Sequence, residues 1–174
     1  MTPPRESRFR RALFVSLAGL EAGMIGALLL LGWLGVAAKW HRRSFWAPEN
    51  LMASVFYGAD AIRGGFSSRT VSGLALYLLL YSVLGALFAF AVQARLPRFR
   101  TALLGVLFAL SWYYLSFQVL LRTVAPLITR LHIEAPTIWG HVIYGAMLGR
   151  FPVYFALGEK EQSEAPPAGS EADG

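Results

Sequence analysis

The chain has 174 residues, of which 56% are hydrophobic and only 15% are charged, and it carries a formal net charge of +6. This composition is too apolar for a soluble domain and is typical of one membrane domain with short tails. The absence of cysteine excludes disulfides, thiolate catalysis and cysteine-based metal sites. The basic residues cluster at the ends of apolar runs, which favours lipid headgroups over nucleic acid as their partner.

The first apolar run covers residues 12–38, and Glu21 is its only ionisable residue. It follows a basic segment, residues 1–11, and is long enough to cross a bilayer. A cleaved signal peptide has a similar basic start, but its apolar region is only about 7–15 residues long. We therefore expect the first transmembrane helix here.

The connection that follows, residues 39–70, is the longest in the chain. Within residues 48–57, apolar side chains recur at helical spacing, and Pro48 suits a first helical position. The pattern predicts a short amphipathic helix in the headgroup region of the membrane. A lid packed on the outer ends of the transmembrane helices fits the same pattern equally well.

Three further apolar runs are interpreted as membrane helices. Residues 71–92 and 101–121 are joined by a short basic connection, so we expect an antiparallel helix pair. Residues 122–135 are predicted to be a loop. The last helix is predicted over residues 136–157, with a kink at Pro152.

The chain ends in residues 159–174, where acids alternate with Pro, Ala, Ser and Gly, and this segment is predicted to be a disordered tail. Four spans place both termini on one side of the membrane. Basic residues crowd the helix ends on that side, which favours a cytoplasmic location for both termini. The predicted fold is all-α, a polytopic membrane four-helix bundle over residues 12–158 with an interfacial helix between helices one and two.

Polar side chains of the last three predicted helices lie at a common depth, counted from the midpoint of each span. Hydroxyl groups that faced lipid would lose hydrogen bonds, so we expect these side chains to face one another or water. The cluster is predicted to contain His141, Tyr77, Tyr81, Tyr114, Gln118 and Ser111.

Two interpretations of this cluster stay open. One is a small binding or proton-handling site on the outer side, with His141 as its titrating member. The other is a set of interhelical hydrogen bonds that only holds the bundle together. No second histidine or carboxylate lies near His141 in sequence, and no nucleophile has a base at a recognised spacing. We therefore expect neither a metal site, nor a cofactor, nor an enzyme.

Two charged residues are predicted within the membrane helices at similar depth, Glu21 and Arg150. A charge near the bilayer centre costs about 2.5–3.5 kcal/mol, so we predict that the two form an ion pair. The alternative is that Arg150 extends to the headgroups while Glu21 is protonated or reached by water.

Glycines spaced by four residues mark places where membrane helices approach closely. One pair lies in helix one, on the face opposite Glu21, and the other lies in helix four. These predicted packing residues are Gly19, Gly23, Gly145 and Gly149.

Two sets of short motifs stand out: Trp46-Ala47-Pro48-Glu49-Asn50-Leu51, and Gly140-His141 followed by Tyr144-Gly145 and Leu148-Gly149. With these motifs the chain resembles small uncharacterised four-helix bacterial membrane proteins over about residues 12–157. The resemblance implies a helical membrane protein without an assigned activity. The glutamate within helix one is also similar to that of the small multidrug resistance transporters, although this chain is longer and has a larger first loop.

The sequence therefore leaves two classes of function. The first is a structural or accessory protein of a bacterial inner membrane, which fits the absence of a catalytic constellation. The second is a small proton-coupled transporter or exporter that acts as an oligomer. The expected partners are the lipid bilayer and a second copy or another membrane protein, with no nucleic acid.

Overall fold

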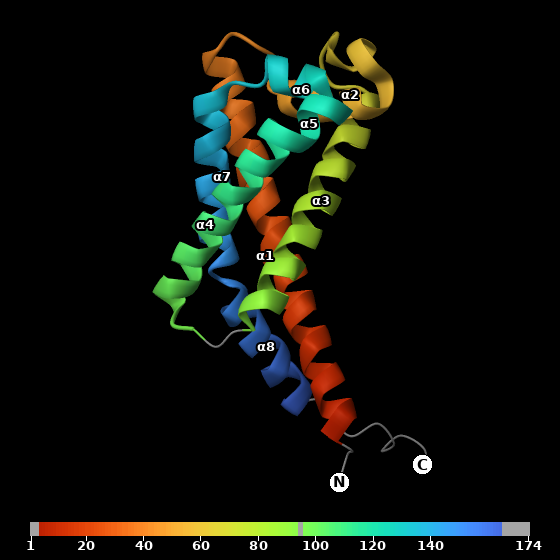
Figure 1. The fold of residues 1–174 in the computed structure, drawn as a ribbon. Helices are drawn as coiled ribbons and strands as arrows, with labels where there is room; N and C mark the ends of the chain where they lie inside the picture. Colours follow the sequence, from red (N-terminus) through yellow and green to blue (C-terminus); the bar gives the residue numbers. More distant parts are fainter. Residues whose placement is uncertain (1–3, 94–95, 165–174) are drawn as a thin grey trace, which may run out of the picture.

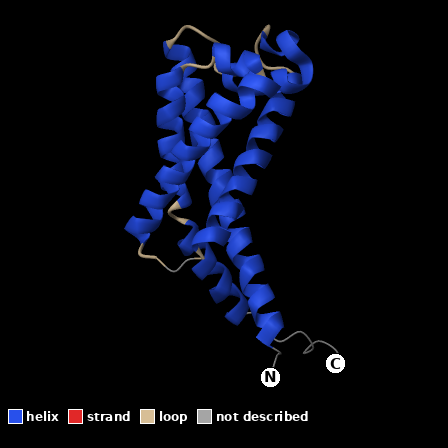
Figure 2. Cartoon of the chain, in the orientation of Figure 1, coloured by secondary structure: helices blue, strands red, loops and turns tan. Residues whose placement is uncertain are grey.

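The computed structural model describes residues 4–93 and 96–164, and every regular element within these ranges is helical (Figure 1, Figure 2). The all-α prediction is confirmed. In chain order the elements are α1 (Pro4–Trp40), α2 (Ala47–Tyr57), the 3₁₀ helix η1 (Gly58–Ile62), α3 (Ser68–Val92), α4 (Arg98–Leu115), the π-helix η2 (Ser116–Leu120), α5 (Leu121–Val124), α6 (Pro126–Leu131), α7 (Glu134–Leu148) and α8 (Phe151–Glu164).

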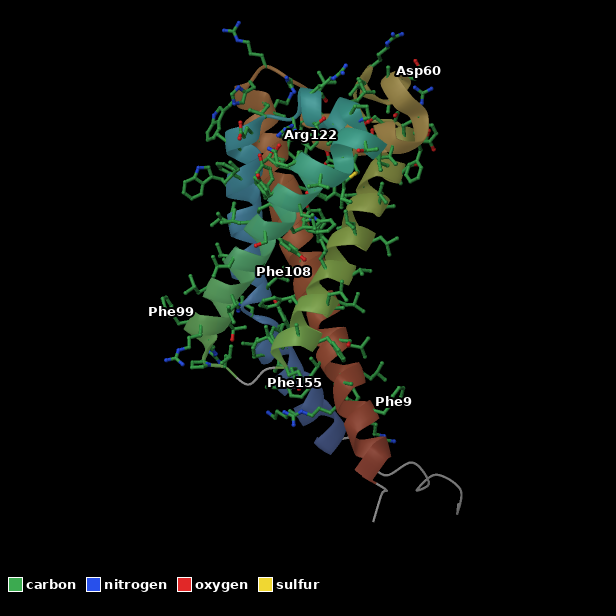
Figure 3. The ribbon with its side chains drawn as sticks, in the orientation of Figure 1. Phe9, Asp60, Phe99, Phe108, Arg122 and Phe155 are labelled. Atoms are coloured by element: carbon green, nitrogen blue, oxygen red, sulfur yellow. The ribbon has the colours of Figure 1, made fainter. Side chains whose placement is uncertain are left out.

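Among the described residues, three helices are long and apolar enough to cross a membrane. They cover Phe9–Trp40, Ser68–Val92 and Arg98–Val124, the last made of α4, η2 and α5 in direct succession. Large apolar side chains remain exposed on the outer faces of these helices. Phe9 and Phe99, for example, point away from the bundle (Figure 3). Such an extensive apolar surface fits contact with lipid.

The predicted last helix, residues 136–157, is interrupted by a break where a kink at Pro152 was expected. α7 ends at Leu148 and α8 begins at Phe151. Pro152 explains the break, because it lacks an N–H and its ring would clash with the carbonyl of Leu148 in a continuous helix. α7 alone rises about 22 Å at 1.5 Å per residue, which is less than the bilayer core of about 30 Å.

α1 is the central helix of the bundle: it packs on α3, α7 and α8, while α4 packs on α7 (Figure 1). The α1–α3 crossing is made by glycines. A Cβ added to Gly19 would lie 2.6 Å from the Gly85 carbonyl oxygen, and one added to Gly85 would lie 2.7 Å from the Cα of Gly23. Any side chain at these positions would push the two backbones apart.

The second glycine pair forms an equally close contact between α7 and α4. A Cβ added to Gly145 would lie 2.6 Å from the Gly105 carbonyl oxygen, and one added to Gly149 would lie 2.5 Å from the Cα of Ala102. Both predicted glycine pairs therefore pack within the chain.

A cap of short helices lies at the end of the bundle opposite the start of α1 (Figure 1). α2 packs on α3 and also contacts α6. Gly73 of α3 permits this, since a Cβ there would collide with the Glu49 carbonyl oxygen. The structure thus shows the lid arrangement of α2, and its position in the headgroup region stays a prediction. Residues 122–135, predicted to be a loop, instead contain most of α5 and all of α6.

The two ends of the chain also differ from expectation. α8 continues to Glu164, so residues 159–164 are helical where a disordered tail was predicted. The remainder of the predicted tail, residues 165–174, lies outside the described residues, as do residues 1–3. From Pro4 onward, the basic N-terminal segment is part of α1.

We predict that Gly85→Ala lowers the stability of the protein, because overpacking at a closed interface costs about 1–3 kcal/mol. Gly32→Ala is the matched control: it changes the same residue type within α1, where an added Cβ meets nothing within 4 Å. It should be neutral or slightly stabilising, since Gly costs about 0.5–1 kcal/mol relative to Ala in a helix. Thermal unfolding of the purified variants in detergent measures both. Equal unfolding temperatures for Gly85→Ala and the wild type would contradict the glycine crossing.

Candidate functional site: a buried histidine cluster beneath an apolar cavity

His141 is fully buried in α7, and both of its ring nitrogens are hydrogen-bonded. Nδ1 lies 2.7 Å from the Thr137 carbonyl oxygen, and Nε2 lies 2.8 Å from the Tyr81 hydroxyl oxygen. Because a carbonyl can only accept, Nδ1 donates to Thr137, and neutral Nε2 accepts from Tyr81. This leaves no ring nitrogen free for a metal ion. Among the described residues, no group of three His, Cys, Asp or Glu could hold one.

Tyrosines of α3 and α7 surround this imidazole. Tyr77 stacks on Tyr81 with ring centroids 4.9 Å apart, and both side chains are buried. Tyr144 meets Tyr81 edge-on at 4.9 Å and donates its hydroxyl to the Tyr81 carbonyl oxygen at 2.6 Å. The structure therefore brings together three members of the predicted cluster and adds Tyr144, which lies one helical turn after His141 and was overlooked.

The residues predicted to join the cluster from the third helix are wrong, because the helix is rotated by one residue from the expected orientation. The ring of Tyr113 lies 5.2 Å from that of His141, whereas Tyr114 is 67% exposed. Ser111 is also exposed, and the Gln118 side-chain oxygen accepts a hydrogen bond from Arg122. None of the three predicted residues of this helix reaches the histidine.

The rotation of α4 is set by small residues and not by its polar stripe. Gly105 packs against α7, and Ala109 and Tyr113 follow at intervals of four residues on the same buried face. Phe117 continues this face and lies 6.4 Å from His141 between ring centroids. The signal that could have identified Tyr113 was therefore the Gly-Ala stripe that precedes it.

Glu21 and Arg150 do not pair, so the predicted intramembrane ion pair is wrong. Both side chains are exposed, and the ion pair found among the described residues joins Arg63 to Asp60. The reason lies in the α1–α3 crossing, which turns the Gly19 face of α1 toward α3. Glu21 is two positions away, about 200° around the helix, and therefore faces outward.

A cavity of about 370 Å³ lies between the bundle and its cap. Its wall is almost entirely apolar and is built by α1, α3, η2, α7 and the cap helices α2, α5 and α6. Tyr77 and Tyr81 form part of this wall, so the histidine cluster lies directly beneath the cavity. The π-helix η2 contributes Ser116, Phe117 and Leu120. Such bulges occur frequently at functional sites.

The cavity is partly open to its surroundings. Three of its lining side chains, Val55, Leu120 and Val124, are also exposed, which places the opening between α2 and the η2–α5 segment. Arg43 lies at the rim and donates a hydrogen bond to the Leu131 carbonyl oxygen at 2.6 Å. No local sequence pattern predicted this cavity, because its lining comes from segments far apart in the chain.

The cap also buries a carboxyl group. Glu49 of α2 is only 2% exposed, and its Oε2 atom has no hydrogen-bond partner among the described residues. Burial raises the pKa of Glu49, and a hydrogen bond from its own backbone N–H opposes this in part.

The fold and the site together define a helical protein with three candidate membrane spans and a capped apolar cavity. The chain belongs to a family of unknown function, DUF6789, which matches residues 14–164. The match covers all the helices of the bundle and the cap, except the start of α1. No curated protein and no solved structure matches the chain.

We predict that Tyr81→Phe destabilises the protein by about 1–3 kcal/mol, because it leaves a buried imidazole nitrogen without its donor. The ring and its stacking on Tyr77 are retained in this variant. Tyr114→Phe removes the same hydroxyl from an exposed ring on α4 and serves as the control. Thermal unfolding in detergent compares the two. If both variants unfolded at the wild-type temperature, the Tyr81–His141 bond would have no structural role.

Proposed function

We propose that the protein is an integral membrane protein of the bacterial inner membrane, in which α7 and α8 together form a broken fourth crossing and both termini lie in the cytoplasm, with an accessory, non-enzymatic role. In this role it holds a lipid-like hydrophobic molecule in the cavity beneath its cap. The observation that carries the proposal is the apolar cavity of about 370 Å³, which is partly open. Pockets for small organic ligands fall in the same size range, about 300–1,000 Å³, and have similarly apolar walls.

The chemistry of the wall supports a hydrocarbon chain as the bound group. Side chains such as Leu34, Met52 and Leu80 offer only dispersion contacts. Three hydroxyl groups of the wall already have partners: Ser116 donates to the Tyr113 carbonyl oxygen, Thr137 to the Ile133 carbonyl oxygen, and Tyr81 is bonded to His141. A polar ligand that entered this space would lose its hydrogen bonds to water without replacement.

The same groups support an accessory role over catalysis. His141 is held between Tyr81 and the Thr137 carbonyl, so its position is explained by packing and hydrogen bonding. An enzyme would need a nucleophile or a general acid–base pair facing the reacting atoms. The aliphatic hydroxyls of the cavity wall belong to Ser116 and Thr137, which donate to the Tyr113 and Ile133 carbonyl oxygens at 3.1 and 2.7 Å.

We predict that Leu80→Trp fills the cavity and blocks the ligand, whereas Leu79→Trp does not. Leu80 lines the cavity, while the adjacent Leu79 is 64% exposed on the outer face of α3. A photoreactive hexadecanol should label the cavity residues Leu51 and Leu120 in the wild type and in Leu79→Trp. In Leu80→Trp this labelling should fall at least about fivefold, as expected for a clash of about 1 kcal/mol or more.

Mass spectrometry of the labelled peptides locates the sites, and each variant must first elute as a folded species in size-exclusion chromatography. Labelling spread evenly over the outer faces of the helices, and unchanged by Leu80→Trp, would refute the proposed site.

A second candidate function, the proton-coupled exporter, is favoured by the location of Glu21. This carboxyl group is exposed within the candidate span Phe9–Trp40 and makes no ion pair among the described residues. Ionisable residues within membrane helices commonly mark proton or substrate pathways. Because Glu21 faces outward, a pathway through it would have to form between copies of the chain, which fits an oligomeric exporter.

On this second hypothesis, proteoliposomes with an imposed proton gradient should move a cationic dye, and Glu21→Gln should abolish the movement because it removes the protonation site. Glu134→Gln is the control, since Glu134 is an exposed carboxyl at the start of α7. The hypothesis fails if the wild type moves no dye, or if both variants move it equally.

A further inference from the structure

A second cavity of about 330 Å³ adjoins the apolar one at the rim of the cap. The two cavities share four lining residues, so they are adjacent compartments of one recess at the cap. The shared residues are Arg43, Ala47, Leu51 and Leu131. The second compartment is more polar than the first, because its wall includes Ser44, Asn50 and the Gly64 backbone.

Arg43 is the only charged side chain among the described residues that line either compartment. It is exposed and forms no ion pair with an acid in the described part of the chain. One of its terminal nitrogens, Nη1, donates to the Leu131 carbonyl oxygen at 2.6 Å. A guanidinium group carries five N–H donors, so most of them remain for a ligand.

The surroundings of Arg43 hold it in place. Its bond to Leu131 connects the α1–α2 turn to the end of α6. On the opposite wall the buried Asn50 side chain accepts a hydrogen bond from Thr70 at 2.6 Å and donates one to the Gly65 carbonyl oxygen at 3.1 Å. The polar compartment thus has a hydrogen-bonded wall at Asn50, and Arg43 lies where it adjoins the apolar compartment.

Building on the proposed function, we propose that the bound molecule is an anionic amphiphile whose acidic headgroup binds Arg43 while its hydrocarbon chain occupies the apolar compartment. A guanidinium group pairs with a carboxylate or a phosphate through two parallel hydrogen bonds. Arg43 follows the end of α1 at Trp40, where a span reaches the headgroup level of a bilayer. One molecule can therefore place its hydrocarbon chain in the apolar compartment and its acidic headgroup on Arg43 at the same time.

The headgroup also provides selectivity that the hydrocarbon chain cannot. A chain that leaves the bilayer for an apolar cavity exchanges one apolar environment for another, so it gains only packing. The charge-assisted bond at Arg43 then decides which chain-bearing molecule is retained. A free fatty acid and an anionic phospholipid share this chemistry.

The test is competition against photoreactive hexadecanol in an uncharged detergent. The competitors are hexadecyl phosphate and hexadecanol, which have the same chain. With the wild type, hexadecyl phosphate should compete at least about tenfold better, since a hydrogen bond to a charged group contributes on that scale. Arg43→Gln should abolish this preference while it still binds hexadecanol. Arg42→Gln removes an adjacent exposed arginine that lines neither compartment, and it should behave as the wild type.

Each contrary outcome has a separate meaning. Equal competition by the two compounds with the wild type overturns the anionic headgroup but leaves the proposed hydrophobic site intact. Failure of both compounds to displace the probe overturns the proposed site and this inference together. If Arg43→Gln also stopped binding hexadecanol, Arg43 would act by holding the cap, and headgroup recognition would be refuted. Hexadecanoate and phosphatidylglycerol, compared in the same assay, show which source of anion the recess prefers.

Discussion

The close crossing of α1 and α3 at Gly19, Gly23 and Gly85 is the constraint on which the rest of the structure depends. α1 is the central helix, so its rotation decides what every neighbouring helix meets. With the glycine face against α3, Gly26 is directed toward Tyr144 of α7, since a Cβ there would lie 2.8 Å from the Tyr144 ring. The same rotation directs Glu21 outward. A charged residue is thus left on the surface by a packing requirement on the other side of its helix.

The glycine contacts also explain why the bundle contains a cavity. The closest backbone contacts of α1 with α3, and of α7 with α4, lie in the half of the bundle away from the cap, and Gly149 against Ala102 is an example. In the half nearest the cap, larger side chains such as Leu34 and Trp112 line the cavity instead of glycines. The short helices α2, α5 and α6 cover the space that remains.

Local sequence patterns predicted the helices and the depth of the polar residues. Counting residues from the middle of each predicted helix was enough to predict that Tyr81 lies near His141. Rotation about the helix axis was harder to predict. For α4 the polar stripe was expected to face inward, but Gly105 packs on α7 and carries Tyr113 to the histidine instead. The break before Pro152 was expected only as a kink. Local patterns could not predict the cavity. Its shape depends on how helices from distant parts of the chain pack against one another, and small residues on each helix determine that packing.

The distribution of charge around the cavity explains why Arg43, at the rim, is the residue expected to choose the ligand. Burial raises the pKa of Glu49, which favours the neutral form of the carboxyl nearest to the cluster. His141 lies behind the wall, bonded through Nδ1 to the Thr137 carbonyl oxygen and through Nε2 to the Tyr81 hydroxyl. Arg43 brings the positive charge of its guanidinium group to the rim. The recess therefore combines an uncharged interior with one positive charge at its junction, and this asymmetry orients an amphiphile with its acidic group toward the rim.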